Sequence, residues 1–190
     1  MRKIIFSIPI TLDGYIEGPH RELDWVKADD ELHDFYSDLL EQTDLILFGR
    51  RTYELMISYW PKAPSDPTLP KGMLRYANTV NPMKKIVYST TLKKADWNAQ
   101  VVNTVNLDEI KKMKEQPGKN IALGGGAALA QVFIQYGLVD EYQLVVQPVV
   151  IGKGTSLFGG IQNPPKLEFA WMQSLKSGAV ALCYRSIGSQ

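Results

Sequence analysis

Cysteine and histidine are scarce in this sequence. Among 190 residues there is one cysteine, Cys183, and there are two histidines, His20 and His33. A single cysteine excludes an intrachain disulfide, and Cys183 lies in a β-rich apolar run that predicts a buried, inert thiol. The histidines lack the His-Glu-x-x-His spacing of zinc hydrolases, and no cysteine cluster accompanies them. We therefore expect no metal site.

The sequence also lacks a charge excess and a long apolar run. Its 21 basic and 20 acidic residues give a formal net charge of +1, so it has no general attraction for nucleic acid or for an anionic membrane. No apolar run reaches the roughly 20 residues that span a bilayer. The first residues pass directly into a strand pattern rather than a signal peptide. We expect a cytoplasmic protein whose partner is a small-molecule substrate, not nucleic acid or membrane.

The residues that are present are typical of a globular protein. Hydrophobic residues make up 45% of the chain and charged residues 22%, a composition too apolar for a disordered protein. A chain of 190 residues has the usual length of one domain and can bury a core without covalent cross-links. The sequence therefore predicts a single domain over residues 1–190.

Strands and helices are predicted to alternate along most of the chain. Runs of apolar and β-branched residues predict strands at 3–10, 44–48, 85–88, 100–105, 120–123 and 141–150. Helical spacing predicts helices at 29–40, 50–57, 108–115 and 127–136. The proline-rich stretch Trp60–Pro70 is predicted to be a loop, either a lid or a plain surface loop. With a final strand pair at 166–172 and 179–185, this order predicts a three-layer α/β/α fold with a mostly parallel central sheet and an antiparallel C-terminal edge.

The strongest local motif is a triple glycine between a predicted strand and a predicted helix. Gly124-Gly125-Gly126 follows the strand 120–123, and Ala127-Ala128 begins the helix. Glycines let a ligand approach the backbone, and a helix start offers free N–H groups and a positive dipole end to an anion. A pyrophosphate suits this environment, and a tight turn without a ligand is the alternative. The motif is not the Rossmann fingerprint, because Leu129 stands where the third glycine belongs.

Two further turns after predicted strands carry hydrogen-bond donors. Gly49-Arg50-Arg51-Thr52 offers guanidinium and hydroxyl groups to a phosphate such as the 2′-phosphate of NADPH, while ordinary surface arginines are the alternative. Ser89-Thr90-Thr91 offers hydroxyls. Ligands of open α/β sheets bind outside the carboxyl ends of the strands. The three turns together therefore predict a site for one dinucleotide.

Other catalytic chemistries have little support in the sequence. There is no Gly-x-Ser-x-Gly elbow of the kind found in hydrolases. Gly152-Lys153 is followed by Gly154 rather than by the Ser or Thr of a P-loop. The acids at 29–31 can supply a proton donor, or they can simply complement the dipole of the helix that they begin.

Short motifs form an ordered set over nearly the whole chain. They are Thr11–Ile16, Leu23–Trp25, Gly49–Tyr53, Lys85–Leu92, Gly124–Gly126, Gly137–Glu141, Pro148–Gly154 and Leu157-Phe158. No single motif is specific, but the set resembles the dihydrofolate reductase-like superfamily. Within it, the chain is most similar to the bacterial branch related to the reductase domain of the riboflavin-biosynthesis deaminase/reductase.

The resemblance implies an NADPH-dependent reductase, often a homodimer. Such an enzyme passes hydride to a C=N or C=O carbon of a pterin-, pyrimidine- or carbonyl-type substrate. The implied phosphate contacts lie at 49–52 and 124–128, the adenosine side at 89–90, and the nicotinamide and substrate near Trp25 and the strand end 8–10. The implied cofactor-binding residues are Trp25, Gly49, Arg50, Thr52, Ser89, Thr90, Gly124, Gly125, Gly126, Ala127 and Ala128.

Two departures from the relatives leave the substrate open. The riboflavin-type reductase carries a substrate-binding glutamate where this chain has Gly124. Dihydrofolate reductase uses an acid early in its first long helix, and ungapped counting from Trp25 makes Asp30 the candidate proton donor. Two alternatives on the same fold are a catalytically inactive nucleotide-binding module and a structural homodimer. The homodimer would use apolar residues such as Ile134, Tyr136 and Leu138.

Overall fold

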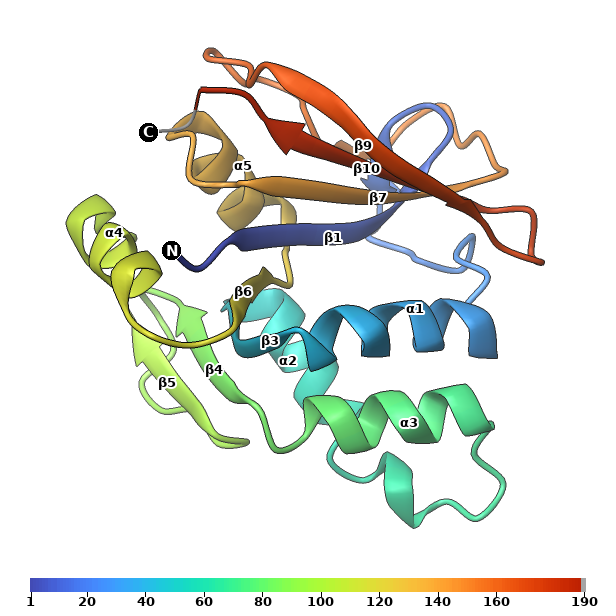
Figure 1. Cartoon of the computed structure of the whole chain (residues 1–190). Coiled ribbons are helices and arrows are strands. Elements are labelled where there is room, and N and C mark those ends of the chain that lie inside the picture. The colour runs from blue at the N-terminus through green and yellow to red at the C-terminus, as the bar shows by residue number, and fades with distance from the viewer. Residues whose placement is uncertain (189–190) are drawn as a thin grey trace. The chain divides into compact units, whose positions relative to one another are not determined.

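The computed structural model describes residues 1–188, which form two compact units that alternate along the chain. The first unit comprises Met1–Lys3 and Ala28–Gly126, and the second comprises Ile4–Lys27 and the chain from Ala127 onward. Figure 1 shows the elements of both units in chain order. The single domain over 1–190 stays a prediction. No described helix is long and apolar enough to cross a membrane.

The first unit contains four parallel strands in the order β5-β4-β3-β6. Its strands are β3 (Thr43–Gly49), β4 (Lys84–Tyr88), β5 (Ala99–Val102) and β6 (Asn120–Leu123). Its helices are α1 (Asp30–Glu41), α2 (Arg50–Tyr59), α3 (Lys71–Val80) and α4 (Leu107–Glu115), with a 3₁₀ turn at Ala63–Ser65. A buried cluster that includes Ile46, Phe48, Val87 and Ala122 holds the strands and helices together. Apart from α3, these helices and strands lie where the sequence predicts them, within a few residues.

Local side-chain caps explain where two of the helices begin. The Asp29 carboxylate accepts a hydrogen bond from the Leu32 N–H at 2.9 Å and so caps α1. The Asn106 side chain caps α4 in the same way, through the N–H groups of Asp108 and Glu109. Such caps satisfy N–H groups that have no partner inside the helix.

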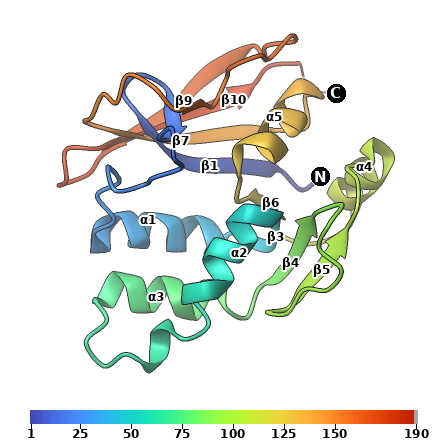
Figure 2. The same ribbon diagram turned by 180° about the vertical axis from the view of Figure 1, so that it is seen from behind.

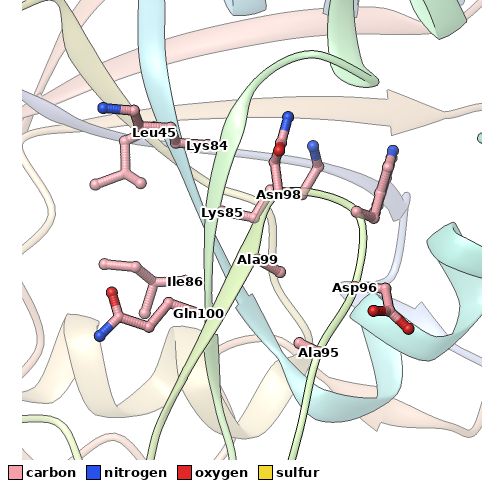
Figure 3. Close-up of a pocket in the computed structure, with 10 residues that line it drawn as sticks. Leu45, Lys84, Lys85, Ile86, Ala95, Asp96, Asn98, Ala99 and Gln100 are labelled. Atoms are coloured by element: carbon pink, nitrogen blue, oxygen red, sulfur yellow. The ribbon is translucent and has the colours of Figure 1, made fainter.

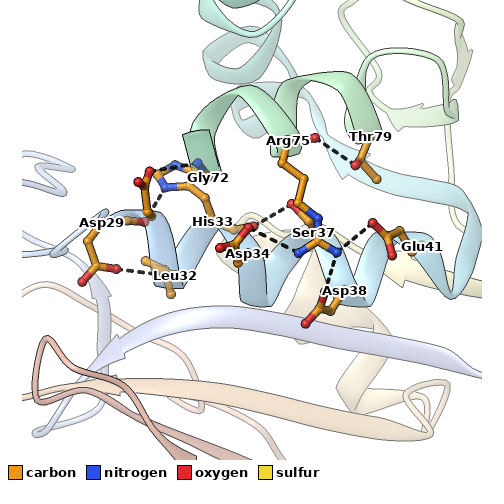
Figure 4. Close-up of polar contacts among 11 residues, drawn as sticks. Asp29, Leu32, His33, Asp34, Ser37, Asp38, Glu41, Gly72, Arg75 and Thr79 are labelled. Carbon is orange, nitrogen blue, oxygen red and sulfur yellow. Dashed lines mark hydrogen bonds and ion pairs between the residues drawn. The ribbon is translucent and has the colours of Figure 1, made fainter. Parts of the chain in front are cut away.

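Helix α3, which the sequence analysis missed, packs along α1 (Figure 2). Arg75 of α3 donates hydrogen bonds to three carboxylates of α1: Asp34 at 3.3 Å, Asp38 at 2.6 Å and Glu41 at 2.8 Å (Figure 4). These groups are partly exposed, so each ion pair contributes only about 0–1 kcal/mol. The helix therefore depends on its packing against α1 as well as on its own sequence.

The second unit combines one parallel and three antiparallel strand pairs. Strands β1 (Ile4–Thr11) and β7 (Glu141–Gln147) are parallel, and β10 (Val180–Ser186) runs antiparallel to both β7 and β9 (Leu167–Ser174). Helix α5 (Ala127–Gln135) and the small pair β2 (Tyr15–Glu17) and β8 (Thr155–Ser156) complete the unit. The predicted antiparallel C-terminal pair is confirmed. Strand β7 ends before Pro148, three residues earlier than predicted, because proline has no N–H for a strand ladder.

Burial in the second unit corrects one interface prediction. Ile134 and Leu138 are buried in the core, so they are not available for association with another molecule. Of the three residues that the sequence analysis named, Tyr136 alone exposes its side chain. Cys183 is buried, as predicted.

Candidate functional site

Three turns of the first unit lie side by side at the carboxyl edge of its parallel strands. Gly49, the last residue of β3, pairs with Tyr88 of β4, and Leu47 pairs with Leu123 of β6. Adjacent strands lie about 4.8 Å apart. The turns that begin after Tyr88, at Gly49 and after Leu123 therefore share one edge, which is where ligands of open α/β sheets bind.

The glycine turn is bound to the end of β3 by backbone hydrogen bonds. The Gly49 N–H donates to the Gly125 carbonyl at 2.8 Å, and the Gly124 N–H donates to the Leu47 carbonyl at 2.9 Å. A Cβ on Gly124 would lie 2.4 Å from the Phe48 ring, and Gly125 has a φ of +85°. The Gly125–Gly126 peptide bond is cis. The first two glycines are thus required by close packing and by a backbone conformation that other residues rarely adopt.

Beside this turn, α2 begins with donors suited to a phosphate. Its cap residue is Gly49, so no side chain at the cap position accepts a hydrogen bond from the helix. The first N–H groups of a helix have no partner within it. Thr52 is half-buried, and its Oγ1 would lie 3.1 Å from a Cβ placed on Gly126. Arg50 is exposed and donates to Glu54 Oε1 at 3.1 Å, one turn along the same helix. The first turn of α2 therefore carries backbone N–H, hydroxyl and guanidinium groups that can donate hydrogen bonds to a phosphate.

The serine turn after β4 is ordered by its own hydroxyl. Ser89 is buried, and its Oγ accepts hydrogen bonds from the N–H groups of Thr91 at 3.2 Å and Leu92 at 2.9 Å. Thr90 is exposed at the tip of the turn. Ser89 therefore shapes the turn, while Thr90 presents a hydroxyl to solvent.

A half-buried tyrosine, Tyr88, ends β4 beside this turn. Burial, with a smaller effect of Glu109, raises the pKa of Tyr88 to about 12. Tyr88 is therefore neutral at physiological pH and adds no charge to the edge.

The remaining predicted residues lie in different places. Ala127 and Ala128 begin α5 directly after the glycine turn. Trp25 belongs to the irregular segment between β2 and α1, where its Nε1 donates to the Glu22 carbonyl at 3.2 Å. Asp30 is exposed, and its Oδ1 accepts from the Gly72 N–H at 3.0 Å, near the start of α3. The cofactor role of Trp25 and the proton-donor role of Asp30 stay predictions.

A pocket of about 570 Å³ occupies the opposite end of the same strands (Figure 3). It is lined by Leu45, Lys84 and Lys85, near the starts of β3 and β4, and by Trp97 and Asn98, which precede β5. None of the residues predicted for the cofactor lines it. Its position at the amino ends of the strands separates it from the edge that carries the three turns.

Sequence reasoning missed one residue of functional interest, Gln147 at the end of β7. Its side chain is fully buried, yet its Nε2 has no hydrogen-bond partner. The sequence signal was a glutamine directly before Pro148, at the end of an apolar strand.

Solved structures share the fold of this chain. It matches a protein of Shewanella sp. PV-4 assigned to riboflavin biosynthesis with a TM-score of 0.76 and 20% identity, over 97% of this chain and 99% of that one. It matches the diaminohydroxyphosphoribosylaminopyrimidine deaminase/5-amino-6-(5-phosphoribosylamino)uracil reductase of Thermotoga maritima with a TM-score of 0.67 and 16% identity, over 98% of this chain and 57% of that one. These likenesses confirm the predicted fold class, a dihydrofolate reductase-like α/β protein.

Sequence relatives make the assignment more specific. The chain is 39% identical to the uncharacterized protein YyaP of Bacillus subtilis (strain 168). The alignment extends over 183 residues, which are 96% of this chain and 94% of YyaP. The chain is 30% identical over 169 residues to the uncharacterized protein YwjB of the same organism, over 88% of each. The family model of the RibD C-terminal domain matches residues 2–181. The chain therefore belongs to the RibD C-terminal domain family, a reductase-like family.

Proposed function

We propose that this chain is an NADPH-dependent reductase that passes hydride to a pterin-, pyrimidine- or carbonyl-type substrate. The observation that carries the proposal is the set of three turns, at Gly49, Ser89 and Gly124, on neighbouring carboxyl ends of parallel strands. Support for the substrate class comes from the Thermotoga maritima structure, whose name includes a uracil reductase.

The donors at this edge fit an anionic dinucleotide. Glycines keep side-chain bulk away from the turn, while backbone N–H groups and the Thr52 hydroxyl suit phosphate oxygens. Arg50 would pair with the 2′-phosphate of NADPH. This contact would replace the exposed ion pair that Arg50 now makes with Glu54. In this proposal Ser89 shapes the adenosine side and Thr90 contacts it.

The nicotinamide supplies the hydride when it is bound. The contribution of this chain is to bind the phosphates, orient the ring and exclude water from the substrate. Because each phosphate contact comes from a turn fixed to a strand end, the cofactor would be held by a preformed edge rather than by a mobile loop.

Binding is tested by thermal unfolding and tryptophan fluorescence with NADPH and NADH in parallel. Cofactor at one hundred times its Kd is expected to stabilise the protein by about 2.7 kcal/mol. If neither nucleotide shifts the unfolding midpoint or changes the fluorescence, the proposed function is wrong.

The Arg50→Ala variant tests the phosphate contact. We expect it to weaken NADPH binding by about tenfold or more and to leave NADH binding nearly unchanged, because a charge-assisted hydrogen bond to the 2′-phosphate is lost. Kd values from fluorescence titration measure the effect. The matched control is Glu54→Gln, which removes the carboxylate that now holds Arg50 and should not weaken NADPH. Equal losses for both nucleotides in Arg50→Ala would assign Arg50 no part in reading the 2′-phosphate.

A second candidate function is a nucleotide-binding module without turnover. The observation that favours it is the contact of Asp30, the predicted proton donor, with the backbone of α3. NADPH binding without oxidation of NADPH in the presence of pterins, pyrimidines and small carbonyl compounds would support this module over the reductase.

A further inference from the structure

The side chain of Gln147 lies at the carboxyl end of the parallel strand pair in the second unit. Gln147 is the last residue of β7 and pairs with Thr11, the last residue of β1. Its side chain is 0% exposed, and its Nε2 has no hydrogen-bond partner. A buried amide N–H without an acceptor disfavours folding, so its presence requires an explanation.

The amide oxygen of Gln147, Oε1, accepts a hydrogen bond, and this contact defines the orientation of the amide group. Gln147 Oε1 accepts from the Lys27 N–H at 3.4 Å, and the Lys27 ammonium donates to the Ser177 carbonyl at 3.2 Å. Because Oε1 must face an N–H donor, Nε2 is the atom left without a partner. A contact of 3.4 Å is long for an N–H···O bond, so the side chain can leave it at small cost.

The neighbouring polar group at this strand end is already committed. Thr11 Oγ1 accepts from the Tyr15 N–H at 2.9 Å. The Asp13 carboxylate accepts from the Gly152 N–H at 2.7 Å, so it joins the loop after β1 to the loop after β7. None of these hydrogen bonds involves Gln147 Nε2.

A second buried glutamine on the same strand provides the contrast. Gln143 lies four residues earlier on the same face of β7, and its Nε2 donates to Glu141 Oε1 at 3.0 Å. One buried glutamine therefore has its partner inside the protein and the other does not. An apolar side chain of similar size at position 147 would avoid the unpaired donor, which points to a ligand that supplies the acceptor.

We propose that Gln147 binds the substrate, with Nε2 donating a hydrogen bond to a ring carbonyl oxygen of a pterin or pyrimidine. This inference rests on the proposed reductase function and assigns its substrate a carbonyl acceptor. Gln147 stands at the carboxyl ends of two parallel strands, the position at which α/β folds bind ligands. The substrate reaches Nε2 when the Gln147 side chain turns away from Lys27.

The test compares two pteridines that differ at one position, with NADPH present at saturation. 6-Methylpterin carries a 4-oxo group, which accepts a hydrogen bond, and 2,4-diamino-6-methylpteridine carries a 4-amino group in its place. Wild-type protein is expected to bind the oxo compound about tenfold more tightly, the change that one neutral hydrogen bond can produce. Gln147→Leu should lose that preference, keep the wild-type Kd for NADPH and unfold at the same or a higher temperature.

The Gln143→Leu variant is the control for replacing a buried glutamine on β7. It is expected to unfold at a lower temperature, because it removes the buried hydrogen bond from Gln143 to Glu141, and to keep the preference for the oxo compound. The inference is overturned if wild-type protein binds neither pteridine or shows no preference between them. It is also overturned if Gln147→Leu keeps the wild-type preference. If wild-type protein does not bind NADPH, the proposed function itself is contradicted, and this outcome is distinct from a failure of the inference about Gln147.

Discussion

At the scale of single residues, Lys85 of β4 binds the end of α3 through hydrogen bonds to backbone carbonyls. It is 2% exposed, and its ammonium donates to the carbonyls of Val80 at 2.8 Å and Met83 at 2.7 Å, where α3 ends. The same nitrogen lies 4.0 Å from the centroid of the Trp97 ring. Burial lowers the pKa of Lys85 to about 8. The residue therefore joins β4 to α3, although burial disfavours its charged form.

This pKa predicts a pH dependence of stability. The unfolded chain keeps the Lys85 proton up to a pKa of about 10.4, whereas the folded protein releases it near pH 8. Between these values the unfolded state binds more protons, so the contribution of Lys85 to stability rises with pH, by at most about 3 kcal/mol. The neutral Lys85 amine has two N–H groups, so it can still donate to the carbonyls of Val80 and Met83.

Urea unfolding of wild-type protein and of Lys85→Met, measured from pH 7 to pH 10.5, tests this expectation. The difference in unfolding free energy should move in favour of wild type above pH 8, and a constant difference would contradict it.

At the scale of elements, the start of α3 depends on a side chain from α1. The Asp30 carboxylate accepts from the Gly72 N–H, and a Cβ on Gly72 would lie 2.5 Å from the Asp30 carbonyl oxygen. The glycine permits the close approach of the two helices, and the carboxylate satisfies one N–H of the first turn of α3. The same carboxylate is the predicted proton donor, so structural and catalytic roles compete at this position.

The Asp30→Asn variant separates these roles. The asparagine oxygen can still accept from Gly72, so the unfolding free energy should change by less than about 1 kcal/mol. If Asp30 is the proton donor, the rate of NADPH oxidation with a substrate should fall by about a hundredfold or more, because an amide cannot donate that proton. An unchanged rate in a stable variant would leave Asp30 with the structural role alone.

At the scale of the whole molecule, β9 offers a surface for association. It is an edge strand of the second unit and presents Phe169, 58% exposed, and Met172, 64% exposed. Edge strands carry unpaired backbone N–H and C=O groups that can pair with another chain. The homodimer that the family resemblance implies would therefore be expected to use this strand.

We predict a dimer at micromolar concentration and a monomer for Phe169→Lys, which places a charge on the edge strand. Light scattering coupled to size exclusion measures both masses. Tyr136→Lys, on the exposed side of the turn after α5, is the control and should leave the dimer intact. A monomeric wild-type protein would refute the homodimer, and a dimeric Phe169→Lys variant would exclude this edge as its interface.

The sequence identified the elements whose signals are local. Apolar periodicity marked most strands and helices, and the acids at 29–31 marked the start of α1. Gly124 and Gly125 were recognisable because a tight strand-to-helix turn leaves a clear local pattern. Helix α3 was not predicted from the sequence, because it follows a proline-rich stretch, contains a glycine at position 72 and is stabilised by packing on α1.

The sequence by itself determined the order of strands and helices, because neighbouring residues set backbone conformation and apolar spacing. Tertiary structure alone decided that the turns at Gly49, Ser89 and Gly124 share an edge, because strand order and register depend on pairing between distant segments. It also gave the Asp30 carboxylate a partner 42 residues away and left the Gln147 amide without one. Hydrogen bonds between segments far apart in the sequence form only in the packed chain, so no local pattern could predict them.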